Sequence, residues 1–200
     1  MNKLKPFRRY EIIAGIGFIL ATISYSIGNA LVESQLPQIK SISTTITTSL
    51  TIGAVLELIN SVSVITIGFM FYLRLKQFNK NLVLGYLISR FVEGTLLLVG
   101  TLSFLQSYIA PFYLHQALFN IAMLSLSIYS TIFFLALMKD KLGPHWLFLL
   151  GVIGYAALCV YASINLLPLS MIAPLWLFGP GAIFELVFPL WLMVKGFNKP

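Results

Sequence analysis

Apolar residues dominate the chain in long runs, which short polar intervals separate. A helix needs about 20 residues to cross ~30 Å of hydrocarbon. Six runs reach this length, and they cover approximately residues 10–32, 50–73, 82–105, 113–138, 145–166 and 171–194. The pattern therefore predicts an all-α protein, a polytopic transmembrane bundle of six helices.

The composition agrees with a membrane protein. Of the 200 residues, 58% are hydrophobic and only 10% are charged, which is far from the usage of soluble globular domains. No polar interval between the runs exceeds roughly 15 residues, which is too short to fold alone. We therefore expect one six-helix transmembrane domain over residues 1–200.

The positions of Lys and Arg predict how the bundle faces. If the N-terminus is cytoplasmic, every Lys and Arg except Lys40 and Arg90 falls in a segment on the cytoplasmic side. Because cytoplasmic loops carry the excess of positive charge, we expect both termini in the cytoplasm and a multi-pass protein of the cell inner (plasma) membrane. The same flanking residues explain the net charge of +7, so no nucleic acid is expected as a partner.

The first run has an alternative interpretation as a cleavable signal peptide. Gly28, Asn29 and Ala30 loosely satisfy the small-residue rule for a cleavage site. The apolar run is longer than a signal core of about 7 to 15 residues, which favours an uncleaved helix.

Four ionisable side chains lie inside the apolar runs: Glu57, Arg90, Glu93 and Glu185. An ionised group in hydrocarbon is costly unless it is paired or hydrated, so these groups are expected to face one another or a cavity. With a helical rise of about 1.5 Å per residue, Arg90, Glu93 and Glu185 lie ~12, ~16 and ~14 Å from the cytoplasmic end. They therefore share one level, and Arg90 and Glu93 share one helix face.

Glu57 lies closer to the other side of the membrane, with Asn60 one turn further in. Glu57 is a candidate to line an outward-facing vestibule. Three carboxyl groups share one arginine, so at least one carboxyl is expected to be neutral at neutral pH. Such a group can exchange a proton, or it can accept a cationic or hydroxyl-bearing ligand. The alternative is an ion pair that locks helices together without any ligand.

The sixth run contains a predicted helix break at Gly179, Pro180 and Gly181. Proline removes a backbone donor and clashes with the preceding turn, and glycine lowers the cost of unwinding. Transporters use broken helices near the membrane middle to bind substrates or ions. A passive kink is the alternative, since glycine and proline are tolerated in membrane helices.

Other chemistry finds little support in the residues. Cys159 is the only cysteine, and Asp140 is the only aspartate. His115 and His145 are expected near opposite membrane interfaces, so they cannot share a haem iron. We therefore expect no catalytic residue, no metal and no cofactor. The expected partners are the lipid bilayer and a small-molecule ligand, and a homo-oligomer or another membrane partner stays open.

Two local patterns carry a family resemblance. They are Gly85-Tyr86 followed by Arg90-x-x-Glu93, and a C-terminal pattern from Gly181-Ala182-Ile183-Phe184-Glu185 through Pro189-Leu190-Trp191-Leu192 to Lys195-Gly196-Phe197. They resemble a bacterial integral membrane family, the domain-of-unknown-function family 4386, over residues 9–197. The resemblance implies a six-helix bacterial inner-membrane protein with no established activity, and it supplies no catalytic residue.

Three functions are compatible with these observations. The favoured one is a non-enzymatic membrane protein whose buried cluster binds a small solute or a proton, as a transporter or an accessory subunit. The second is an intramembrane enzyme for lipid or isoprenoid substrates, with Glu93 or Glu185 as general acid or base. The third is a membrane scaffold with a purely structural ion pair.

Overall fold

The computed structural model describes residues 7–34, 47–104, 109–167 and 173–198 of the chain. These residues form six long helices and one short 3₁₀ helix, η1: α1 (Arg8–Glu33), α3 (Thr48–Leu75), α4 (Lys80–Phe104), α5 (Ile109–Lys139), α6 (His145–Leu166), η1 (Leu175–Phe178) and α7 (Gly179–Val194). The helices, with η1 and α7 taken together, give six spans long and apolar enough to cross a membrane. The predicted all-α bundle of six helices is confirmed for the described residues, and the chain is a multi-pass membrane protein. The predicted limits at residues 105 and 171 lie outside the described residues.

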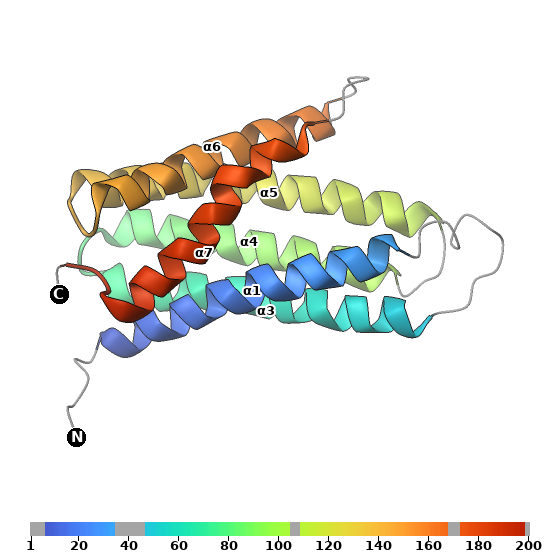
Figure 1. Ribbon diagram of the computed structural model, residues 1–200, viewed down its shortest axis with the longest axis horizontal. Coiled ribbons are helices and arrows are strands. Elements are labelled where there is room, and N and C mark those ends of the chain that lie inside the picture. The colour runs from blue at the N-terminus through green and yellow to red at the C-terminus, as the bar shows by residue number, and fades with distance from the viewer. Residues whose placement is uncertain (1–6, 35–46, 105–108, 168–172, 199–200) are drawn as a thin grey trace.

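The six helices form a closed ring. Each helix packs against the next one along the chain, and α7 packs against both α6 and α1. Helix α1 begins and α7 ends at one end of the bundle, which we call the terminal end (Figure 1). The opposite end, where α1 ends and η1 begins, is called the distal end. Helix α7 runs obliquely from α6 at the distal end toward α1 at the terminal end, so the interior is closed mainly by this one helix.

The outer face of α1 illustrates why these sequences form helices in a bilayer. Its exposed apolar residues recur every three or four positions: Ile13, Ile16, Leu20, Ile23 and Ile27. The opposite face is buried and carries small residues and one aromatic ring, namely Ala14, Ala21 and Phe18. Such a stripe suits the 3.6-residue period of an α-helix, with lipid on one side and the bundle interior on the other.

Glycines bring α6 and α7 into close contact. A Cβ atom on Gly154 would lie 2.7 Å from the Cα atom of Gly181, and one on Gly151 would lie 2.8 Å from the ring of Phe184. No side chain fits between the two backbones at Gly154, so the small residues permit the contact. Gly151 and Gly154 therefore serve packing within the bundle.

Aromatic side chains fill the interior toward the terminal end. The most buried are Phe71, Tyr86, Phe133, Phe134, Phe148, Phe184 and Phe188, each with an exposed fraction of 0%. Their rings pack directly on one another, with centroids 4.1 Å apart between Tyr86 and Phe133 and 4.8 Å apart between Phe184 and Phe188. We call this group the aromatic plug. It leaves the distal half as the part of the interior that is open to a ligand.

Candidate ligand-binding cavity

Arg90 of α4 is the most enclosed cation in the described part of the bundle, with 2% of its surface exposed. All three guanidinium nitrogens donate hydrogen bonds. The Nε atom donates to the hydroxyl of Tyr86 at 2.9 Å, Nη1 to Oε2 of Glu93 at 3.0 Å, and Nη2 to the hydroxyl of Tyr155 at 3.2 Å. The contact expected from the three-residue spacing of Arg90 and Glu93 is therefore present as a buried ion pair.

Two neighbouring helices shape the space around the guanidinium. Its Cζ atom lies 5.3 Å from the ring centroid of Phe18 on α1 and 5.2 Å from that of Tyr86. On α3, a Cβ atom at Gly68 would lie 2.8 Å from Cβ of Arg90, so only glycine leaves room for the arginine stem. Cation–π contact and hydrogen bonds together hold the charge in place.

Glu185 of α7 is held less firmly than Glu93. Its carboxylate accepts a hydrogen bond from the hydroxyl of Tyr155 at 3.4 Å and one from Oγ1 of Thr22 at 3.3 Å. Both bonds are long, and Glu185 forms no ion pair with any residue that the structure describes. Tyr155 accepts from Arg90 and donates to Glu185, so one hydroxyl links the two charges. We call Arg90, Glu93, Tyr155 and Glu185 the central cluster.

A cavity of about 460 Å³ extends from the central cluster toward the distal end. Arg90, Glu93, Tyr155 and Glu185 all line it, and further polar groups come from the distal turns of α1, including Ser26, Asn29 and Glu33. The lining residues Ser26, Glu33, Leu175 and Ala182 are exposed, so the cavity opens between α1 and the η1–α7 segment. Its volume lies within the range of small-molecule sites, roughly 300 to 1,000 Å³.

The remaining sequence candidates on α3 separate in space. Asn60 lines the cavity, whereas Glu57 is not among the described residues that do. Glu57 is buried on the α4 and α5 side, where its Oε2 accepts a hydrogen bond from Thr101 at 2.8 Å and its Oε1 lies 3.7 Å from Nε2 of His115. The vestibule expected beside Glu57 is therefore lined by Asn60 and not by Glu57.

The two histidines differ in burial. Both were expected near a membrane interface, but only 2% of the surface of His115 is exposed, whereas His145 is exposed. A Cβ atom on Gly100 would lie 3.2 Å from Nδ1 of His115, so the ring packs against α4 at a position that glycine leaves open. Depth along a helix does not determine which side of the helix a residue faces, so the sequence did not reveal that His115 is buried.

The predicted helix break lies beside the cavity. The 3₁₀ helix η1 ends at Phe178, and α7 begins at Gly179, with Pro180 in its first turn. Proline is accommodated there because the first backbone N–H groups of a helix have no intrahelical acceptor. Gly181 and Ala182, in the following positions, line the cavity.

A second arginine–glutamate cluster was missed from the sequence. At the terminal end, Glu11 of α1 accepts from Nη1 of Arg8 at 2.9 Å, from Nε of Arg74 at 2.6 Å and from the backbone N–H of Phe197 at 3.2 Å. Arg8 also donates to the backbone oxygens of Leu192, at 2.7 Å, and Met193. We call Arg8, Glu11, Arg74 and Phe197 the terminal clasp.

The terminal clasp joins α1, α3 and the segment after α7. It therefore stabilises the ring of helices where α7 meets α1. Glu11 was missed because it stands close to the start of the first run, among residues that look like a basic flank. Its spacing of three from Arg8 was the available signal, since such pairs lie on one helix face.

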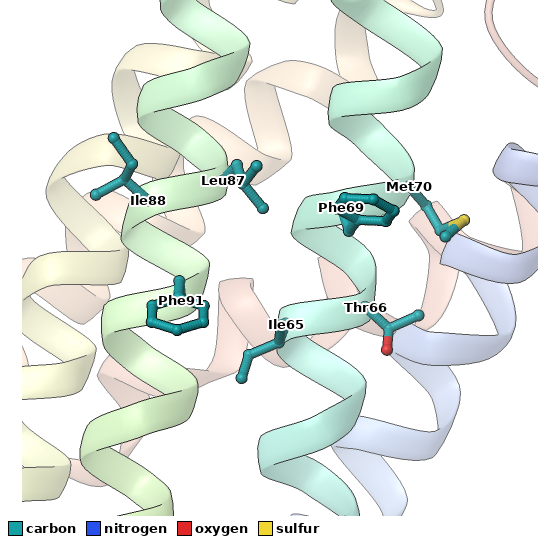
Figure 2. Close-up of a pocket in the computed structure, with 7 residues that line it drawn as sticks. All are labelled: Ile65, Thr66, Phe69, Met70, Leu87, Ile88 and Phe91. Carbon is teal, nitrogen blue, oxygen red and sulfur yellow. The ribbon is translucent and has the colours of Figure 1, made fainter.

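The bundle also has an apolar hollow on its outside, between α3 and α4. Figure 2 shows its lining residues, which include Ile65, Phe69, Ile88 and Phe91. Thr66 is the only polar residue among the described residues that line it, and its hydroxyl donates to the backbone oxygen of Val62 at 2.8 Å. The described lining is therefore suited to lipid contact and lacks the charged groups of the cavity. Among the described residues, no group of three or more His, Cys, Asp and Glu is placed to hold a metal ion.

Comparison with known proteins gives a family. The family model described as "Domain of unknown function (DUF4386)" matches residues 13–110 and 112–196. The match includes the whole central cluster. Neither a curated protein nor a solved structure matches the chain significantly.

Proposed function

The chain belongs to the DUF4386 family, and from this premise we propose that it is a membrane protein that reversibly binds a small solute in its cavity. The observation that carries the proposal is the position of Glu185. It is a carboxylate deep in a membrane bundle, without an ion pair among the described residues, and it borders a cavity of about 460 Å³. An intramembrane acidic group that faces a cavity marks a functional site by default.

The proposal includes the orientation of the protein. We propose that both termini are cytoplasmic and that the distal end faces the outside of the plasma membrane. The basic residues at the terminal end, such as Arg9, Lys76, Lys139 and Lys195, support this orientation. The cavity would then open outward, while the aromatic plug closes the cytoplasmic side. This arrangement suits one state of a transporter, in which a central site is open to one side of the membrane.

A purely structural role accounts for less of the site. The ion pair of Arg90 and Glu93 needs no further charged partner, because the two side chains on α4 neutralise each other. It would require neither a third ionisable group, Glu185, nor a cavity beside it. Burying an additional carboxylate is unfavourable, so its presence favours a ligand.

Thermal stabilisation of the purified protein in lipid nanodiscs tests the proposal. A panel of amino acids, sugars, amines, organic acids and isoprenoid alcohols is added to wild type, Glu185→Gln and Ala182→Trp. Because Ala182 lines the mouth of the cavity, an indole at this position fills the entrance. We expect at least one solute to raise the melting temperature of wild type, and this shift to be reduced in both variants. No shift with any solute, or equal shifts in all three proteins, contradicts the proposal.

A further inference from the structure

We infer that the ligand of the cavity is a monovalent organic cation, an amine with an apolar body, and that Glu185 is its counter-ion. The inference rests on the proposed function, because it assumes that the cavity binds a solute. It goes further by assigning the chemical class of the solute.

The charged groups around the cavity are mostly acidic. Among the described residues that line it, Glu33, Glu93 and Glu185 are acidic and Arg90 is the only Lys or Arg. Arg90 is paired with Glu93 at 3.0 Å, so the remaining charge of the wall is negative. A cationic ligand would complete the pairing that the protein leaves open at Glu185.

Arg90, the cation in the described cavity wall, is already engaged by neighbouring side chains. Each guanidinium nitrogen already donates to Tyr86, Glu93 or Tyr155, and the ring of Phe18 lies against the guanidinium. An anionic ligand would have to compete with the carboxylate of Glu93 for the positive charge. Glu185 presents the opposite situation, because its two hydrogen bonds are long and both come from neutral hydroxyl groups.

Two aromatic pairs border the cavity: Tyr25 stacks on Phe119 with ring centroids 5.3 Å apart, and Tyr161 contacts Phe178 at 4.3 Å. Aromatic faces attract cations and also pack well against apolar groups. The wall therefore suits an ammonium group with an organic body better than a bare inorganic ion, which needs several oxygen ligands.

The entrance is consistent with the same class of ligand. Glu33 is exposed at the distal end and belongs to the lining. A negative group at the mouth of a cleft with low-dielectric walls attracts cations and raises their local concentration. Glu33 would therefore steer the ligand, and Glu185 would bind it further inside.

The experiment compares three probes with the same aromatic body and different charge. Binding of 2-phenylethylammonium, 2-phenylethanol and phenylacetate to the full chain in nanodiscs is measured by calorimetry at neutral pH, with empty nanodiscs as the blank. We expect the ammonium to bind at least ~10-fold more tightly than the other two. Glu185→Gln should weaken the ammonium at least ~10-fold and leave the alcohol unchanged, because only the cation uses the carboxylate charge.

Two variants keep the result interpretable. Glu185→Asp retains the charge and should retain the preference for the ammonium even if its affinity changes. Asp140→Asn removes one negative charge at an exposed position in the α5–α6 connection at the terminal end, so it should bind all probes like wild type. A preference that is lost equally in Asp140→Asn and in Glu185→Gln overturns the assignment of Glu185.

The outcomes separate this inference from the proposed function. If the alcohol or phenylacetate binds as tightly as the ammonium, and Ala182→Trp removes that binding, the cavity is a solute site but the ligand class is wrong. If none of the three probes binds while the solute panel yields a neutral or anionic ligand, the inference fails and the proposed function stands. If the probes and the panel are both without effect, the proposed function fails, and the inference fails with it.

Discussion

The terminal clasp and the central cluster use the same residue types in opposite proportions. In the terminal clasp, the single carboxylate of Glu11 lies between two guanidinium groups, and two backbone oxygens also accept from Arg8. In the central cluster, the guanidinium of Arg90 pairs with the carboxylate of Glu93, and the second carboxylate, that of Glu185, forms no ion pair with any described residue. In the terminal clasp the protein pairs its own carboxylate. In the central cluster one carboxylate, that of Glu185, has no cationic partner among the described residues.

The surroundings of the two clusters follow the same division. Packed rings enclose the terminal clasp, where the guanidinium of Arg74 lies 5.5 Å from the ring centroid of Phe7 and 5.6 Å from that of Phe197. The central cluster instead borders the cavity. The comparison teaches that a buried arginine–glutamate pair is not in itself a sign of function. An excess of carboxylate groups over guanidinium groups beside a cavity is the more informative feature.

The largest effect on stability is expected from Glu11→Ala. This change leaves Arg74, a side chain that is only 4% exposed, without its carboxylate. Removing one partner of a buried ion pair costs about 3 to 5 kcal/mol, because the other charge stays buried without compensation. Thermal unfolding of the purified protein should show a large fall in melting temperature. A melting temperature equal to that of wild type would contradict the structural role of the terminal clasp.

Arg90→Met should destabilise the protein by a somewhat smaller amount, about 3 kcal/mol, because Glu93 can escape part of the penalty by taking up a proton. The double variant Arg90→Met with Glu93→Leu removes both charges and should recover most of the loss. Recovery in unfolding experiments would show that the pair itself is replaceable. Failure of the double variant to recover would mean that Arg90 stabilises the bundle through its other partners, Tyr86 and Tyr155.

Much of the fold was predictable because the length of an apolar run and the depth of a residue along a helix can both be counted from the sequence. Apolar runs of membrane-spanning length gave the helices, and the helical rise gave one shared level for Arg90, Glu93 and Glu185, which the structure places around one cavity. The rotation of each helix about its axis was not predictable in the same way. Depth alone therefore did not show that the ring of His115 faces inward.

The bridging role of Tyr155 was unpredictable for a related reason. A tyrosine in an apolar run resembles an ordinary core or interface residue, and only the ring of helices brings its hydroxyl between Arg90 and Glu185. The cavity likewise depends on the oblique course of α7, which no local pattern specifies. The glycines that permit the α6–α7 contact were the only visible signal of that course.

A moderate effect is expected from Gly154→Ala. Its new Cβ atom would lie 2.7 Å from Cα of Gly181, so α6 and α7 must separate, at a cost of about 1 to 3 kcal/mol. Tyr155 is the next residue, so binding of 2-phenylethylammonium should weaken as well. Gly179→Ala is the matched control, because nothing lies within 4 Å of its Cβ position and its backbone is already helical. Equal unfolding curves for the two variants would contradict the tight α6–α7 contact.

The smallest effect on stability is expected from Glu185→Gln, within about 1 kcal/mol, because this carboxylate has no ion pair to lose among the described residues. The amide oxygen can still accept from the hydroxyl of Tyr155, and the amide nitrogen can donate to the hydroxyl of Thr22. The contrast with Glu11→Ala in the same unfolding assay is the sharpest form of the comparison. If Glu185→Gln lowered the free energy of unfolding as much as Glu11→Ala does, both clusters would serve to stabilise the fold.

The most direct test is an experimental structure of the protein with 4-bromophenylethylammonium bound, in which bromine marks the ligand. The account predicts bromine density in the cavity and the ammonium nitrogen within about 4 Å of the Glu185 carboxylate, as in other ion pairs. It is contradicted if the cavity is empty at saturating probe concentration and Glu185 pairs directly with Arg90.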